Sequence, residues 1–191
     1  MSARRLRGER GVVTVELAII MIVLLYLCVG TADFGLAWRD KLTIENATRA
    51  GSRTASNLGR DRYADYNLLQ GVRAAVADIP AASIVRIVVF RADSSGTPSA
   101  TCRAGTPSAG EPCNVYTAAS LLLPQSAFTG TTTCTGSSPD LRWCPTGRVT
   151  DQDTADYLGV WIEIRRDHLT DLIPGTTTIH STAVMRLEPG G

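Results

Sequence analysis

The longest run of apolar positions in the chain lies close to its amino terminus. Residues 12–32 read VVTVELAIIMIVLLYLCVGTA and contain one carboxylate, Glu16. A helix over this run is about 31 Å long at about 1.5 Å per residue, which matches the hydrocarbon core of a bilayer. Apolar residues continue to Trp38. The pattern therefore predicts a transmembrane helix over residues 12–38.

Residues 39–58 continue this helix as a stalk with apolar residues at three- to four-residue spacing. Ile44 lies off this stripe, in which small residues predominate. The stripe comprises Leu42, Ala47, Ala50, Gly51, Thr54, Ala55 and Leu58. It docks either onto the protein's own sheet or onto a partner. After a break at residues 59–62, a second amphipathic helix is predicted over residues 63–79, and Pro80 ends it.

Three later segments have the composition or the alternation of β-strands. They are SIVRIVVFRAD (83–93), YLGVWIEIRRDH (157–168) and TTTIHSTAVMRLE (176–188). In the second, apolar and polar residues alternate as in a half-buried strand. The order of elements predicts an α+β fold, in which a small head of antiparallel sheet packs on the helix that emerges from the membrane.

Between the first two strands, residues 92–156 form a long segment rich in Pro, Gly, Ser and Thr, and it holds four of the five cysteines. Cys102, Cys113, Cys134 and Cys144 lack the close C-x-x-C pairs of a zinc site, so we interpret them as a disulfide framework. Three pairings are open, and nearest neighbours are the simplest. Disulfides would place residues 39–191 outside the cytoplasm.

The distribution of charge along the sequence also predicts how the chain is oriented in the membrane. The 19 Lys and Arg nearly balance the 18 Asp and Glu, which argues against a nucleic-acid partner. However, the residues before the apolar run include four arginines and one acid. Such a cluster stays on the cytoplasmic side. The expected location is the cytoplasmic (inner) membrane, with a single pass and the carboxyl-terminal part outside.

Glu16 needs an explanation, because a charge within the bilayer costs several kcal/mol unless it has a partner or lies near the interface. It is the fifth residue after Gly11. A basic leader, a glycine and an apolar helix with Glu at position five together resemble the type IV prepilin processing site. The resemblance implies that prepilin peptidase removes residues 1–11 and frees the amine of Val12. That ammonium and the Glu16 carboxylate would then reduce each other's cost of burial.

The resemblance extends beyond the processing site. ELAII (16–20), ADFG (32–35) and NATRAGSR (46–53) are similar to the TadE-like family of minor pseudopilins of tight-adherence (Flp) pili, as is HSTAVMRLEP (180–189). A TadF-like relative would share the same plan. The family implies other pilin and pseudopilin subunits as partners. Asp33, at the outer end of the membrane segment, would make either a helix-end contact or a contact to a neighbouring subunit.

Little in the sequence points to chemistry. His168 and His180 both fall in or beside predicted strands, and nucleophile, phosphate-binding and zinc-protease motifs are absent. Asp151, Asp153 and Asp156 have the D-x-D spacing of a calcium loop but lack its glycine and closing glutamate. A solvated acidic turn is the alternative. We expect no catalytic residue, no metal and no cofactor.

The sequence thus favours a structural protein, a processed minor pseudopilin that moves from the inner membrane to the pilus or cell surface in assembly or adhesion. The alternative is an uncut, membrane-anchored binding module whose cysteine-containing loop contacts a ligand. A membrane-tethered enzyme has the least support.

Overall fold

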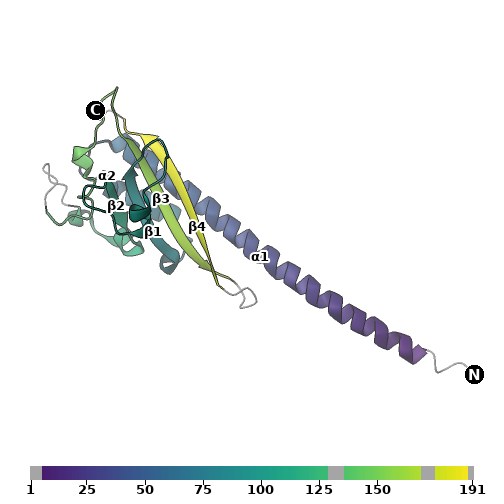
Figure 1. The fold of residues 1–191 in the computed structure, drawn as a ribbon. Helices are drawn as coiled ribbons and strands as arrows, with labels where there is room; N and C mark the ends of the chain where they lie inside the picture. The colour runs from purple at the N-terminus through teal and green to yellow at the C-terminus, as the bar shows by residue number, and fades with distance from the viewer. Residues whose placement is uncertain (1–5, 129–135, 169–174, 189–191) are drawn as a thin grey trace, which may run out of the picture.

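The computed structural model describes residues 6–128, 136–168 and 175–188, with the backbone alone for residues 6–10. A single long helix, α1 (Leu6–Leu58), projects far beyond a head built from the remaining elements. Figure 1 shows the amino terminus at the free end of this helix and the head packed along its other half. The predicted anchor and stalk are therefore one continuous helix.

The head is a four-stranded antiparallel sheet with the strand order β2-β1-β3-β4. Its strands are β1 (Ile84–Arg91), β2 (Cys113–Tyr116), β3 (Tyr157–Asp167) and β4 (Thr176–Arg186). β1 pairs with both β2 and β3, and β4 pairs with β3 along its whole length. The predicted α+β class, with antiparallel sheet on helix, is confirmed.

All three predicted strands are present, and β2 is a fourth that the sequence pattern did not predict. It has only four residues and lies within the segment 92–156 that was predicted to be a loop. So short a strand carries no readable alternation. The same segment also contains a short helix, α3 (Ala100–Ala104), and several single 3-10 turns, one of them at Ala118–Leu122.

Both faces of the sheet are covered. The carboxyl-terminal half of α1 and helix α2 (Ala64–Ala75) form the main core with one face, to which Val89 and Val160 contribute. On the other face, Val88 and Trp161 pack with the cysteines of α3 and β2 in a smaller cluster. Adjacent strand residues point to opposite faces, so a strand buried on both sides reads as a continuous apolar run. This accounts for IVVF in β1.

The side of α1 that faces the head differs from the predicted stripe. Ile44 is fully buried, whereas Leu42 is 46 % exposed and Ala50 is also exposed. Besides Ile44, the buried positions are mostly small, and three of them are hydroxylated: Ala47, Thr48, Gly51, Ser52, Ala55 and Ser56. A Cβ at Gly51 would lie 2.8 Å from Cγ2 of Val72, so glycine lets α2 approach closely. Of the two partners considered for the stripe, the protein's own head occupies this side of the helix.

Candidate functional site

The amino-terminal half of α1 presents apolar side chains to the surroundings. Every residue from Gly11 to Cys28 is exposed, Val12 by 67 %. Within the described part of the chain, α1 is the one helix long and apolar enough to cross a membrane. An apolar surface of this size on a free-standing helix suits a single membrane anchor.

Glu16 lies on this exposed part of α1, and one turn from it in each direction lie Val12 and Ile20. One helical turn corresponds to about 5.4 Å, so the Val12 amide nitrogen and the Glu16 carboxylate belong to adjacent turns of one helix. Gly11 also lies within α1, and a Cβ there would meet no atom within 4 Å. The three residues of the predicted processing site are thus adjacent on one open stretch of helix.

Asp33 marks the point at which α1 reaches the head. It is 7 % exposed and is the first buried residue along the described helix. Asp33 lies within α1, which continues to Leu58, and its proposed contact role stays a prediction. Phe34 and Trp38 point away from the head, and their stacked rings lie 6.2 Å apart.

Polar contacts join α1 to β4 along what we call the α1–β4 seam, formed by Lys41, Thr48 and Ser56 of the helix. Lys41 Nζ donates to the His180 carbonyl at 2.7 Å, and Ser56 Oγ donates to the Arg186 carbonyl at 2.5 Å. Between them, the Thr48 hydroxyl lies 3.3 Å from that of Ser181. The buried hydroxyls of Thr48 and Ser56, which interrupt the apolar spacing of the helix, therefore have hydrogen-bond partners in β4. These contacts fix the head to the stalk.

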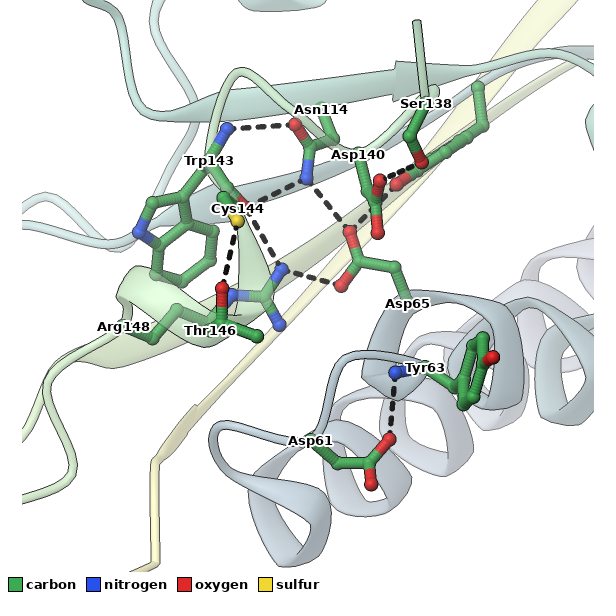
Figure 2. A network of polar contacts seen from close by, with 11 residues as sticks. Asp61, Tyr63, Asp65, Asn114, Ser138, Asp140, Trp143, Cys144, Thr146 and Arg148 are labelled. Atoms are coloured by element: carbon green, nitrogen blue, oxygen red, sulfur yellow. Dashed lines mark hydrogen bonds and ion pairs between the residues drawn. The ribbon is translucent and has the colours of Figure 1, made fainter. Parts of the chain in front are cut away.

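A buried polar network lies near β2, at the edge of the sheet opposite β4, and Figure 2 shows it from close by. At its centre is Asp65 of α2, whose Oδ2 accepts hydrogen bonds from Asn114 Nδ2 at 2.8 Å and from the Tyr116 hydroxyl at 2.7 Å. Arg148 Nη2 donates to Asp65 Oδ1 at 2.5 Å, and both side chains are fully buried. The network thereby connects α2, strand β2 and the loop that carries Arg148.

The loop contributes further contacts to this network. Its Trp143 backbone nitrogen donates to Asn114 Oδ1 at 2.9 Å, and the Arg148 guanidinium lies 4.3 Å from the centre of the Trp143 ring. Among the described residues, Nε and Nη1 of Arg148 have no hydrogen-bond partner. Asp65, Asn114 and Arg148 are buried, so the contacts of the network connect separate parts of the head.

Two ionisable groups of the network are shifted by burial. Burial, followed by the nearby Asp65 carboxylate, raises the pKa of Tyr116 well above its ordinary value of 10.0. Burial also raises the pKa of Asp140 above 3.8, although Ser138 donates a hydrogen bond to its carboxylate. The protonated forms of both groups are therefore favoured in the folded head.

A disulfide joins Cys102 of α3 to Cys113 of β2, with their Cα atoms 6.3 Å apart. This is one of the two nearest-neighbour pairs predicted from the sequence. Cys134 lies outside the described residues, so a Cys134–Cys144 bond remains a prediction.

Asp151, Asp153 and Asp156 lie in an acidic turn, and one of their carboxylates already accepts a backbone hydrogen bond. Asp156 Oδ2 accepts from the Val149 backbone nitrogen at 2.9 Å, while Asp151 and Asp153 are exposed. In the described residues, the metal-type ligands that gather closely are Glu111 and the two disulfide sulfurs instead. The structure therefore does not bring the three aspartates together as a ligand set.

The two histidines lie in different surroundings at the sheet. His168 Nε2 is 3.5 Å from the Thr177 hydroxyl, and the His180 ring lies 6.2 Å from that of Trp161. These are contacts across the β3–β4 pair. They agree with the structural role expected from their positions in the sequence.

Comparison with known families addresses the long helix. A family model described as "TadE-like protein" matches residues 11–53. This segment is TadE-like. The TadE-like segment includes the exposed half of α1, Asp33 and most of the helix side of the α1–β4 seam. The match concerns this segment alone and suggests a relation to the Tad pilus.

The match ends before α2, so the head lies outside it. No curated protein and no solved structure matches the chain. The part of the chain that resembles the family is thus the anchor and stalk. The Asp65–Arg148 network had no signal in the sequence, because its members come from separate segments with ordinary composition.

Proposed function

We propose that the chain is a minor pseudopilin of a tight-adherence (Flp) pilus, cut after Gly11 by prepilin peptidase and built into the pilus through α1. The observation that carries this proposal is an apolar, exposed half-helix with one acid, Glu16, in a segment whose family match begins at Gly11. The head would be carried by the helix to the pilus or cell surface, where it serves assembly or adhesion.

The position of Glu16 gives the proposal its physical basis. Cleavage after Gly11 turns the Val12 nitrogen into an ammonium, which lies about one helical turn from the Glu16 carboxylate. Either charge alone is costly in lipid, and removal of one leaves the other unpaired. Between neighbouring subunits the same pair would set the register in which the helices pack. Close packing of helices in lipid depends on such polar contacts and on small residues.

Two independent features support an orientation with the head outside the cytoplasm. The arginines before Gly11 would hold the leader on the cytoplasmic side. The Cys102–Cys113 disulfide is stable in an oxidising compartment. Both features support the same compartment for the residues after the anchor, from 39 onward. The partners would be prepilin peptidase and other pilin or pseudopilin subunits.

Intact mass of the membrane-extracted chain, made with and without the peptidase, tests the processing step. We expect the peptidase to remove residues 1–11. The variant Gly11→Ala is a suitable control, because a Cβ at this position meets nothing and the fold should be unchanged while the bond to be cut is altered. An unchanged mass in the presence of the peptidase would refute the proposal.

Glu16→Ala tests the assembly step. We expect this variant to be cut but to fail in pilus assembly, while Glu16→Asp, which keeps the charge, retains part of it. Electron microscopy of sheared pili and immunoblots of the chain within them give the readout. Normal assembly of Glu16→Ala would contradict a role for the charge pair.

The second candidate is an uncut, membrane-anchored binding module. The observation in its favour is the disulfide-bonded, networked head, which lies outside the TadE-like match. The mass measurement separates the two candidates, because only the pseudopilin loses its leader.

A further inference from the structure

We propose that a pocket at the point where α1 leaves the head binds the headgroup of a zwitterionic phospholipid that carries both a phosphate and a primary ammonium, as in phosphatidylethanolamine. The proposal rests on the proposed function, since it needs α1 to be the membrane anchor. The pocket has a volume of about 290 Å³. Its lining includes Leu36, Arg39, Asp78, Pro80, Arg165 and Asp167.

The position of this pocket along α1 corresponds to the level of lipid headgroups. Apolar residues continue to Trp38, and Arg39 follows it directly. A helix over residues 12–38 is about 40 Å long at about 1.5 Å per residue, close to the roughly 40–45 Å of a bilayer with its headgroups, so Arg39 lies at the outer limit of the headgroup region. The exposed, stacked rings of Phe34 and Trp38 lie just before it, and aromatic residues are typical of this interface.

Three cationic and three anionic side chains line the pocket, and four of these six form two ion pairs. Arg39 Nη2 lies 3.1 Å from Asp78 Oδ2, and the two side chains are 62 % and 76 % exposed. Deeper in the pocket, Arg166 donates to Asp40, and this pair is only about one-fifth exposed. The inner pair therefore joins the stalk to β3, whereas the outer pair is open to an external ligand. An exposed ion pair of this kind contributes little by itself, so its two members can take other partners.

This pairing selects the class of ligand. A purely anionic headgroup, such as phosphatidylglycerol, would satisfy Arg39 but be repelled by Asp78. A headgroup with phosphate and ammonium offers each member of the pair an opposite charge and a hydrogen bond. The trimethylammonium of phosphatidylcholine carries the charge but has no N–H to donate to the carboxylate. The expected order of affinity is phosphatidylethanolamine, then phosphatidylcholine, then phosphatidylglycerol.

The test uses the full chain in detergent micelles titrated with dioleoyl forms of these three lipids, with bound lipid counted by native mass spectrometry. We expect an affinity for phosphatidylethanolamine about threefold to fivefold above that for phosphatidylglycerol, the range that one exposed ion pair supplies. Asp78→Asn should abolish this preference, because it lowers phosphatidylethanolamine binding and removes the repulsion of phosphatidylglycerol. Arg39→Gln should weaken both.

Arg53→Gln is the matched control, because Arg53 is exposed on α1 but lies 14 residues beyond Arg39, about 21 Å along the helix. It should leave the order of affinities unchanged. Equal binding of the three lipids, strongest binding of phosphatidylglycerol, or a preference insensitive to Asp78→Asn would overturn the proposal. Membrane fractionation and the mass measurement distinguish this from a failure of the proposed function. A chain that is inserted and cut but shows no lipid preference refutes only the headgroup site.

Discussion

Asp65→Asn is the substitution that most directly tests how the head is held together. It removes the negative charge with almost no change in volume and leaves the fully buried Arg148 guanidinium without its counterion. Loss of one partner of a buried ion pair costs about 3–5 kcal/mol, compared with about 5–15 kcal/mol for the stability of a whole domain. The hydrogen bonds from Asn114 and Tyr116 are also weakened, since a neutral amide oxygen accepts less strongly than a carboxylate.

Urea unfolding of the full chain in micelles, followed by tryptophan fluorescence, measures this effect, because Trp143 lies in the network and reports its loss. We expect Asp65→Asn to lower the free energy of unfolding by about 3–5 kcal/mol. Arg148→Met removes the cation instead and should be costly alone. The double variant should lose less than the sum of the two, because it leaves no unpaired charge.

The reasoning would be refuted by a loss under about 1 kcal/mol for Asp65→Asn, the value of an exposed ion pair. Strict additivity in the double variant would refute it as well, since the two residues would then not interact.

Three further predictions concern the head. Gly159→Ala should destabilise it by about 1–3 kcal/mol, because the new Cβ would lie 2.2 Å from Cζ of Phe90, and adding Phe90→Leu should recover part of the loss in the same unfolding assay. Cys102→Ser should cost about 3 kcal/mol by opening the loop to Cys113, and reduction of the unaltered chain should lower its stability by a similar amount. Because the pKa of Asp140 is raised in the folded head, stability should fall as pH rises from about 3.8 through that raised pKa, and Asp140→Asn should abolish this fall, as unfolding measured from about pH 3 to 7 would show. An Asp140→Asn variant with an unchanged pH profile would contradict the last of these.

The sequence was sufficient to predict the long helix and the class of the head. An apolar run as long as residues 12–32 has few structural interpretations, and the alternation in β3 predicts a strand. The strand was expected to be half-buried, but Trp161 is also buried, on the second face of the sheet. The side of α1 that docks on the head was harder to predict. Thr48 and Ser56 count as polar in any hydrophobicity pattern, yet they are buried because the helix and β4 supply their hydrogen-bond partners.

The buried network could not be predicted at all. Asp65 and Arg148 are separated by 83 positions, and the second lies in a segment rich in turn residues. An aspartate on a helix and an arginine in a loop are ordinary surface residues by composition. Their burial follows from the tertiary arrangement that brings α2, β2 and the loop together. The predicted processing site differs from this network, because its residues are close together in the sequence. It can therefore be recognised from the sequence without knowledge of the fold.

The contacts between α1 and β4 have a consequence for how copies of this protein can associate. β4 is an outer strand of the sheet, and such a strand offers unpaired carbonyls and amides to which a further strand can add. Here the carbonyls of His180 and Arg186 already accept hydrogen bonds from Lys41 and Ser56. The strand at the other edge of the sheet, β2, has only four residues. Both features disfavour growth by addition of a further strand to the sheet. In the proposed pilus, the exposed half of α1 would then be the surface through which subunits associate.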